Sequence, residues 1–404
     1  MGGVTTLTRL PDDYVQNPHE VHDLLRAEGP VQELQLPRGL KVWLVTRYDE
    51  AKLALTAPQV SKNVLEGGHL MAAHSSGEVE NREIEPTLSV HMLNMDPPGH
   101  TRLRKLVTKA FTARRVELMR PRVQEIAAEL LAKLADGDEV DLLEAFAFPL
   151  PITVICELLG IPIDNRADFR EWSNQLLTFG TAEQVQAAAS AMAAFLHQHV
   201  TAIAEAEPND TFFSALVHAD DSGDRLSTEE LISMAFLLLV AGHETTVNLI
   251  GNAVLALLRN PEQLRVLKDR PELIPASTEE FLRLEGPVNV ATFRYTKEPL
   301  DLGGVTVPAG EIVMVSLIAA NRDPEKYENP AQLDVTRSAQ GHLAFGHGIH
   351  FCLGAPLARL EFDVALTQLL ARFPNLSLAA EPETLVWRDS TLIRGLHTLP
   401  VRLA

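Results

Sequence analysis

The pattern of hydrophobic and polar positions along the chain predicts a mainly α fold with a minor β part. From about residue 100 to 290, and again from about 355 to 373, apolar positions recur at helical spacing. Segments rich in β-branched and aromatic residues predict a small β-rich region at about residues 30–46, 291–317 and 385–404. No linker and no internal repeat divides the chain, so we expect residues 1–404 to form a single domain.

The β-rich region contains several individually predicted strands. Pro30–Leu36 and Lys41–Thr46 predict a hairpin that turns at Pro37–Gly39. Further strands are predicted at Ala291–Tyr295, Val305–Val307 and Glu311–Ser316. Residues 61–92 are polar and weakly periodic, which is typical of a functional loop.

The strongest predicted helix begins after Ser227 and ends before Pro261. Ser227 and Glu230 have the spacing of a capping box, and a proline stops the helix at its far end. The helix has about 34 residues, which corresponds to a length of about 50 Å. Its middle, ISMAFLLLVAG, is apolar on every face, so we expect it to be buried and to cross most of the molecule.

Composition narrows the class of protein. The 404 residues include 35 basic and 54 acidic side chains, and the formal net charge of −19 argues against a nucleic-acid partner. Two cysteines are too few for a disulfide scaffold, so a reducing compartment is favoured. The longest apolar run is much shorter than the roughly 20 residues of a membrane span, and the N-terminus has no leader pattern. We therefore expect a soluble, cytoplasmic protein without a membrane anchor.

The net charge hides one basic segment between His100 and Arg122. This basic segment contains one acidic residue, Glu117. Its eight basic residues are Arg102, Arg104, Lys105, Lys109, Arg114, Arg115, Arg120 and Arg122. The local charge is therefore about +7, which favours an acidic partner protein.

The segment FGHGIHFCLG, residues 345–354, is the first candidate for chemistry. Its glycines allow positive φ angles and the close approach of a flat ligand. Cys352 lies just before a predicted helix, whose N-terminus stabilises a thiolate. No second Cys or His follows at zinc spacing, so this thiolate fits a metal that already has four ligands, such as a haem iron.

The second candidate is the polar interruption AGHETT, residues 241–246, inside the long helix. Polar groups buried in an apolar helix destabilise the fold unless they find partners. Gly242 adds a cost of about 1 kcal/mol relative to alanine. Val247 stands where an H-E-x-x-H zinc protease needs its second histidine, which excludes that class.

Together with the E-x-x-R pattern at Glu280–Arg283, these segments resemble the cytochrome P450 superfamily. FGHGIHFCLGAPLARLE is similar to its haem-binding loop, and the motifs keep the family's order from about residue 15 to the C-terminus. The resemblance is strongest to soluble actinobacterial members that tailor macrolides and hydroxylate vitamin D or sterol-like molecules. It implies the P450 fold, with the long buried helix lying over haem b.

The resemblance also implies roles for individual residues. Cys352 would be the iron ligand, and Glu244 and Thr245 would supply protons for dioxygen activation. Further cofactor-binding positions would be Ala241, Gly242, Phe345, Gly346 and Gly354, with His100, Arg104, Arg294 and His350 at the propionates. The substrate pocket would include Leu239, Val290, Ala291, Thr292 and Leu392. Residues 61–92 would form its roof and residues 170–195 its lid, with a hinge at Phe179–Gly180.

Glu280 and Arg283 would have a structural role, as an ion pair that anchors the haem-binding loop. The family usually completes this pair with a third, charged residue. Gln332 stands at the matching position and cannot supply a charge. Arg337 or residues 321–323 could compensate for it.

The implied activity is that of a haem-thiolate monooxygenase, which hydroxylates or epoxidises a bulky hydrophobic natural product with dioxygen. A macrolide or other polyketide is favoured, and a sterol, vitamin D or a terpenoid is the alternative. Electrons would come from an acidic ferredoxin, with its reductase, docked on Arg102, Lys105, Lys109, Arg114 and Arg115. A peroxide-driven peroxygenase and a non-catalytic haem sensor are alternatives against which the pair Glu244 and Thr245 argues. We expect the protein to be a monomer.

Overall fold

A computed structural model of the chain describes all residues except 1–7, 77–85, 178–180, 210 and 220–222. Most of the described residues are helical, which confirms the predicted mainly α class. The α-helices are α1 (Pro18–Glu28), α2 (Tyr48–Thr56), α3 (Val64–Gly67), α4 (His69–Ala73), α5 (Pro86–Ser89), α6 (Gly99–Ala110), α7 (Ala113–Leu118), α8 (Arg120–Leu131), α9 (Pro149–Leu159), α10 (Arg166–Leu177), α11 (Ala182–Glu205), α12 (Phe212–Val217), α13 (Thr228–Leu258), α14 (Pro261–Asp269), α15 (Ile274–Glu285), α16 (Leu317–Ala320) and α17 (Ala355–Arg372).

The strands are short and form four small sheets. They are β1 (Thr8–Arg9), β2 (Val31–Gln35), β3 (Lys41–Val45), β4 (Val60–Ser61), β5 (Glu139–Asp141), β6 (Tyr295–Thr296), β7 (Leu300–Leu302), β8 (Val305–Val307), β9 (Val313–Val315), β10 (Ser377–Leu378) and β11 (Pro400–Arg402). The largest sheet has the order β1-β2-β3-β9, with β2 and β3 antiparallel and the two outer pairs parallel. The others have the orders β10-β11-β5, β4-β6 and β7-β8.

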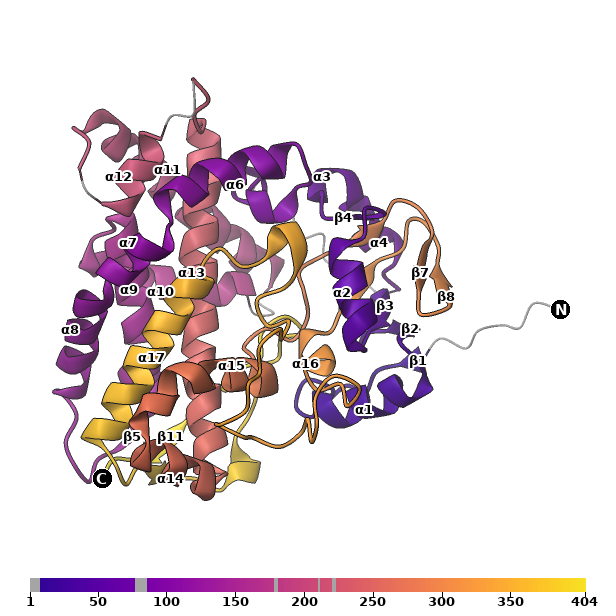
Figure 1. Ribbon diagram of the computed structural model, residues 1–404. Coiled ribbons are helices and arrows are strands. Elements are labelled where there is room, and N and C mark those ends of the chain that lie inside the picture. Colours follow the sequence, from indigo (N-terminus) through magenta and orange to yellow (C-terminus); the bar gives the residue numbers. More distant parts are fainter. Residues whose placement is uncertain (1–7, 77–85, 178–180, 210, 220–222) are drawn as a thin grey trace.

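Most of the long helices lie on one side of the molecule, and the largest sheet lies on the other (Figure 1). Helices α8, α9, α13 and α17 lie together on one side, and β1, β2 and β3 lie with α1 and α2 on the other. Helices α15 and α16 lie between these two sides in this view. The arrangement places the long loop before α17 at the junction of the two regions.

The β-strand predictions are confirmed in part. The hairpin is present, because β2 and β3 pair with Glu33 opposite Trp43. The strand expected at Ala291–Tyr295 is wrong for most of its length, since only Tyr295 belongs to a strand. Residues 287–294 instead run along a cavity. Their backbone forms isolated β-bridges rather than a continuous ladder, for example between Val290 and Ser316.

The long helix α13 is confirmed, with 31 residues. The Ser227 hydroxyl accepts from the Glu230 N–H and the Glu230 carboxylate accepts from the Ser227 N–H, so the predicted capping box is present. By length and composition alone, α13 could cross a membrane, but 67% of its most apolar window is buried inside the protein. Because α9, α11, α15 and α17 all contact it, its apolar surface serves as the centre of the largest hydrophobic core.

Candidate active site

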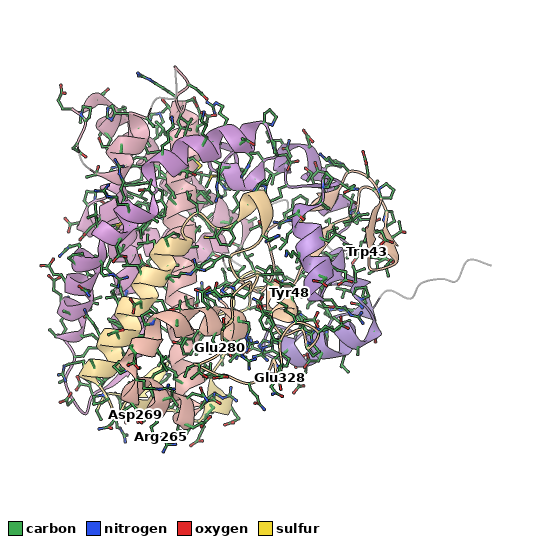
Figure 2. All side chains as sticks on the ribbon, in the orientation of Figure 1. Trp43, Tyr48, Arg265, Asp269, Glu280 and Glu328 are labelled. Carbon is green, nitrogen blue, oxygen red and sulfur yellow. The ribbon has the colours of Figure 1, made fainter. Side chains whose placement is uncertain are left out.

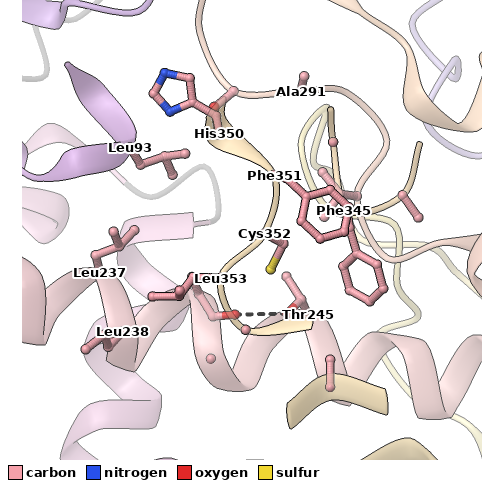
Figure 3. Close-up of a pocket in the computed structure, with 18 of the residues that line it drawn as sticks. Leu93, Leu237, Leu238, Thr245, Ala291, Phe345, His350, Phe351, Cys352 and Leu353 are labelled. Carbon is pink, nitrogen blue, oxygen red and sulfur yellow. Dashed lines mark hydrogen bonds between the residues drawn. The ribbon is translucent and has the colours of Figure 1, made fainter. Parts of the chain in front are cut away.

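A cavity lies between α13 and the loop of residues 345–354 that precedes α17 (Figure 3). It encloses about 1360 Å³ of empty space, part of which is open to solvent. Helix α6, residues 287–294, Met92 and Leu93 supply further parts of its wall. Figure 3 shows Cys352 on the loop and Thr245 on α13 at the same cavity.

The loop that carries Cys352 has the shape that its glycines allow. Gly346 and Gly348 have φ angles of +73° and +75°, which L side chains rarely adopt. The Cys352 N–H donates to the Phe345 carbonyl oxygen over 2.9 Å, which closes the loop on itself. Cys352 is exposed and lines the cavity, so its sulfur is accessible to a ligand bound there.

Opposing effects act on the Cys352 thiol. Surrounding protein raises its pKa above the ordinary value of 9.0, because a thiolate loses hydration there. The backbone N–H groups of Gly354 and Ala355 and the Arg104 side chain act in the other direction without reversing the shift. A metal cation bound at the sulfur would favour the thiolate outright.

A chain of contacts fixes the loop to α15 and α17. The Arg359 guanidinium of α17 lies 4.6 Å from the centre of the Phe345 ring. Arg359 donates to both carboxylate oxygens of Glu279 in α15, over 2.6 and 2.9 Å, and His342 lies 3.1 Å from the same carboxylate. Burial raises the pKa of Glu279, but Arg359 and His342 outweigh it and bring the pKa to about 2. We did not single out Glu279 from the sequence, because no motif marked it.

Glu280 and Arg283 form a fully buried, two-pronged ion pair with N–O distances of 2.7 and 2.8 Å (Figure 2 labels Glu280 on α15). Arg337 completes the group, because its Nε donates to Glu280 over 3.2 Å. Gln332 contributes its backbone carbonyl to Arg283 and no charge. Arg337 is therefore the third, charged residue of this group, in place of Gln332.

The four expected propionate partners all line the cavity. They are His100 and Arg104 on α6, Arg294 on the extended segment, and His350 beside Cys352. The rings of His100 and His350 are 4.3 Å apart, and neither ring nitrogen of His100 has a hydrogen-bond partner among the described residues. This corner places unsatisfied ring nitrogens beside the guanidinium groups of Arg104 and Arg294, which matches a ligand that carries acidic oxygens.

Lys62 is a fifth residue at this corner, and we did not predict it. Its side chain is 3% exposed, lines the cavity and donates to the Thr292 hydroxyl. Burial lowers its pKa well below 10.5, Arg294 lowers it further, and Asp96 partly opposes both. An isolated lysine in a polar loop carries no signal in the sequence, because only the fold brings it to Arg294.

The predicted acid and alcohol of α13 face different surroundings. Thr245 lines the cavity and its hydroxyl donates to the Ala241 carbonyl oxygen over 2.9 Å. Glu244 is buried and is not among the residues that line the cavity. Its carboxylate accepts from Arg388 over 2.8 Å and lies 3.6 Å from His243. Burial raises the pKa of Glu244, but His243 and Arg388 lower it to about 2.

Comparison with known proteins identifies the family. A family model described as Cytochrome P450 matches residues 172–385, more than half of the chain. The chain belongs to the cytochrome P450 family. It is 48% identical over 392 residues to the vitamin D(3) 25-hydroxylase of Pseudonocardia autotrophica, covering 96% of this chain and 94% of that one. It is 44% identical over 385 residues to the 6-deoxyerythronolide B hydroxylase of Saccharopolyspora erythraea, covering 94% of each chain.

A solved structure confirms the fold. The tirandamycin C-bound P450 monooxygenase TamI superposes on this P450 with a TM-score of 0.91 at 48% identity, covering 98% of this chain and all of that one. The predicted P450 fold, with its long buried helix, is therefore confirmed, and the protein is a cytochrome P450 monooxygenase with haem as its cofactor.

The cavity fits this cofactor. A thiol faces it from one wall, and the other wall is α13. The corner of Lys62, His100, Arg104, Arg294 and His350 contains the unpartnered His100 ring, which two propionates would satisfy. The group would therefore lie between Cys352 and α13.

Gly242 lines the cavity, and a side chain at this position would point at Ile155, which lines the same cavity. A Cβ atom at this position would lie 2.8 Å from Cδ1 of Ile155 in α9. Glycine therefore favours the close contact between α9 and α13. The resemblance implied only a cofactor-binding position for Gly242, so this packing role is an addition to it.

Three of the five predicted substrate-pocket residues need correction. Ala291 and Thr292 line the cavity, but Leu239, Val290 and Leu392 do not. Leu237 and Leu238 line it in place of Leu239, because successive residues of a helix point about 100° apart. The remaining two are engaged through their backbones, with Val290 bridged to Ser316 and the Leu392 carbonyl accepting from the Asn289 N–H.

The expected roof and lid receive partial support. From residues 61–92, Lys62 and Met92 line the cavity, whereas none of the described residues of 170–195 does. The hinge expected at Phe179–Gly180 lies outside the described residues.

The basic segment is less cationic in the fold than in the sequence. Arg102 pairs with Asp224 and Glu230. Arg120 pairs with Glu117 and Asp363, and Arg122 with Glu125 and Glu157. A local charge sum omits acidic residues that the fold brings from distant parts of the chain. Four residues of the expected docking surface remain exposed: Lys105, Lys109, Arg114 and Arg115.

Proposed function

We propose that this P450 hydroxylates or epoxidises a bulky hydrophobic natural product of the macrolide or polyketide class, using dioxygen and electrons from a ferredoxin. The observation that carries the proposal is the apolar wall of the cavity, to which Met92, Leu93, Leu237, Leu238, Val288 and Ala291 contribute. A cavity with mostly apolar walls and few polar groups favours a bulky apolar guest. The 6-deoxyerythronolide B hydroxylase and the tirandamycin-bound relative support the choice of substrate class.

On the proximal side, the chain would hold the haem through Cys352 and through this corner. The haem supplies the redox chemistry of dioxygen activation. Cys352 would bind the iron as a thiolate, and Lys62, Arg104 and Arg294 would pair with the propionates. Both histidines of the corner, His100 and His350, would add hydrogen bonds.

On the opposite wall of the cavity, the Thr245 hydroxyl would hold or donate a proton to the reacting group. Because its hydroxyl is tied to the Ala241 carbonyl, its oxygen is held in a fixed position at the cavity. Glu244 would receive protons from outside the cavity and pass them toward Thr245. The apolar wall keeps bulk water away from this side.

Lys105, Lys109, Arg114 and Arg115 would form the docking surface for an acidic ferredoxin. They lie on α6 and α7, and α6 also carries His100 and Arg104 at the cavity. A cationic surface next to the haem would steer an anionic electron donor to a short transfer distance. The protein would work as a soluble, cytoplasmic monomer.

Screening macrolides, other polyketides, sterols and vitamin D for a spin-state shift of the ferric enzyme tests the substrate class. We expect the largest shift from a macrolide or polyketide, and NADPH consumption with added ferredoxin and reductase that depends on the same compound. A preference for sterols or vitamin D would contradict the class. Turnover with hydrogen peroxide alone would support a peroxygenase, and no turnover with either supply would support a sensor.

A further inference from the structure

The acid of α13 is attached to two other parts of the fold. Arg388, in the C-terminal segment, donates from Nη1 to Glu244 over 2.8 Å and from Nη2 to the Asn174 side-chain oxygen of α10 over 3.2 Å. The side chains of Arg388 and Glu244 are 12% and 5% exposed. One guanidinium therefore joins α13, α10 and the C-terminal segment at a nearly buried position.

A second contact runs parallel to this bridge. Nε2 of His243 lies 3.2 Å from the hydroxyl of Ser173, which is adjacent to Asn174 in α10. Nδ1 of His243 lies 2.7 Å from the Leu239 carbonyl, and this contact orients the ring. The polar residues His243 and Glu244 of α13 thus face α10 and the C-terminal segment, whereas Thr245 faces the cavity.

We propose that Arg388 is a positioning residue, which holds the Glu244 carboxylate ionised on the outer side of α13 as the receiving end of a proton path. The path would enter between α10 and the C-terminal segment, where Arg388 and Asn174 are only partly covered. A hydrated proton from bulk solvent would bind to a Glu244 oxygen, leaving neutral water, and would then pass toward Thr245, after which the ionised carboxylate would return to Arg388. The inference rests on the proposed role of Glu244 and Thr245 in proton supply.

Charge supports this arrangement. The ionisable groups that face Glu244 are His243 on its own helix and Arg388 on the C-terminal segment, and the group from α10 is the neutral amide of Asn174. Burial raises the pKa of Glu244, and His243 and Arg388 together reverse that shift. Loss of Arg388 leaves both the burial and the contact with His243 in place, so the pKa of Glu244 should rise above its wild-type value.

The first test is an infrared pH titration of the ferric holoenzyme. In the wild-type protein we expect no protonated-carboxyl band from Glu244 down to about pH 5, well above the range in which its pKa lies. In Arg388→Gln such a band should appear at a higher pH than in the wild-type protein, and it should be missing from Arg388→Gln/Glu244→Gln. An unchanged titration in Arg388→Gln would overturn the inference.

The second test measures product formed per NADPH consumed, on the compound that gives the largest spin-state shift. Glu244→Gln and Arg388→Gln should each lower this ratio about tenfold, and the double variant should lose no more than either one. Arg388→Lys, which keeps the charge but cannot bridge to Asn174 at the same time, should restore part of it. Asp389→Asn, which breaks only the exposed pair with Arg38, is the matched control and should behave as wild type.

The outcomes separate the two ideas. If Glu244→Gln keeps full coupling, the proposed proton supply through Glu244 is wrong. If Glu244→Gln lowers the product formed per NADPH while Arg388→Gln does not, Arg388 does not act through Glu244. The same conclusion follows if the double variant lowers this ratio much more than either single variant. Should Arg388→Gln fail to fold, the same comparisons apply to Arg388→Lys, for which unchanged coupling would contradict the bridge.

Discussion

At the scale of single residues, the charged side chains at the candidate haem site show which functional residues sequence motifs can predict and which they cannot. Cys352, His350 and Arg294 were expected because they match positions of the family that the sequence resembles. Lys62 and Arg388 belong to no pattern, and they reach the site only because the chain folds back on itself. Side chains that act through such long-range contacts cannot be found from local spacing.

Lys62→Met should weaken haem binding without altering thiolate ligation. Removing one buried, charge-assisted hydrogen bond costs about 1.5–3 kcal/mol, so haem should dissociate roughly tenfold or more faster. The reduction potential should fall, because a positive charge near the haem favours the reduced form. Haem transfer to an excess of apo-myoglobin and a redox titration measure the two effects. Lys52→Met, at an exposed position on α2, is the control, and equal behaviour of both variants would refute this role for Lys62.

The buried ion pair of α15 allows a second prediction at this scale. Arg283→Met should destabilise the protein by about 3–5 kcal/mol, because Glu280 would stay buried without its main partner. Arg337→Met should cost less, since the two-pronged contact with Arg283 remains. Urea unfolding of the holoenzyme measures both, with Arg402→Met, from an exposed pair, as the control. A larger loss for Arg337→Met than for Arg283→Met would contradict this order.

At the scale of elements, the helices follow the sequence predictions closely, and the strands follow them only in part. The limits of α13 were predicted from a capping box and a proline, which are local signals. Residues 291–295 were expected to form a strand, because their composition favours extended backbone. Beside the cavity they have no continuous partner strand. Whether a segment pairs with another strand depends on the whole fold and not on the segment's own composition.

Gly242 tests the contact between α9 and α13. Gly242→Val should destabilise the protein by about 1–3 kcal/mol, because the new side chain would overlap Ile155. The loss should shrink in an Ile155→Ala background, where space is available. Urea unfolding of the four proteins in this cycle gives the coupling energy. Additive effects of the two substitutions would show that the contact is not what requires glycine.

At the scale of the whole molecule, the fold decides which acidic side chains lie next to the basic segment. The basic segment was predicted to be strongly cationic, yet three of its arginines pair with acidic residues from elsewhere in the structure or from within the segment. The family, the mainly helical class and the haem loop were predictable, because they rest on long motifs. The shape of the cavity wall was not, since a shift of one residue on α13 exchanges Leu239 for Leu238. That residues 1–404 form a single domain stays a prediction.

The remaining exposed cations allow a prediction about the electron donor. Lys109→Glu/Arg114→Glu should weaken binding of an acidic ferredoxin about tenfold at low salt, and the difference from wild type should shrink as salt rises. Arg102→Glu should act mainly on stability, because its partners are Asp224 and Glu230. Ferredoxin-dependent reduction rates at several salt concentrations measure the first effect. Rates that do not respond to salt or to the double reversal would place the docking surface elsewhere.

The most direct test of the account is the spectrum of the reduced, carbon monoxide-bound protein, recorded for wild type and for Cys352→Ser. Thiolate ligation by Cys352 predicts a strongly red-shifted Soret band in wild type and its loss in the variant, with haem still bound at the corner of Arg104 and Arg294. A red-shifted band that persists in Cys352→Ser would show that another residue binds the iron, and would contradict the assignment of the site.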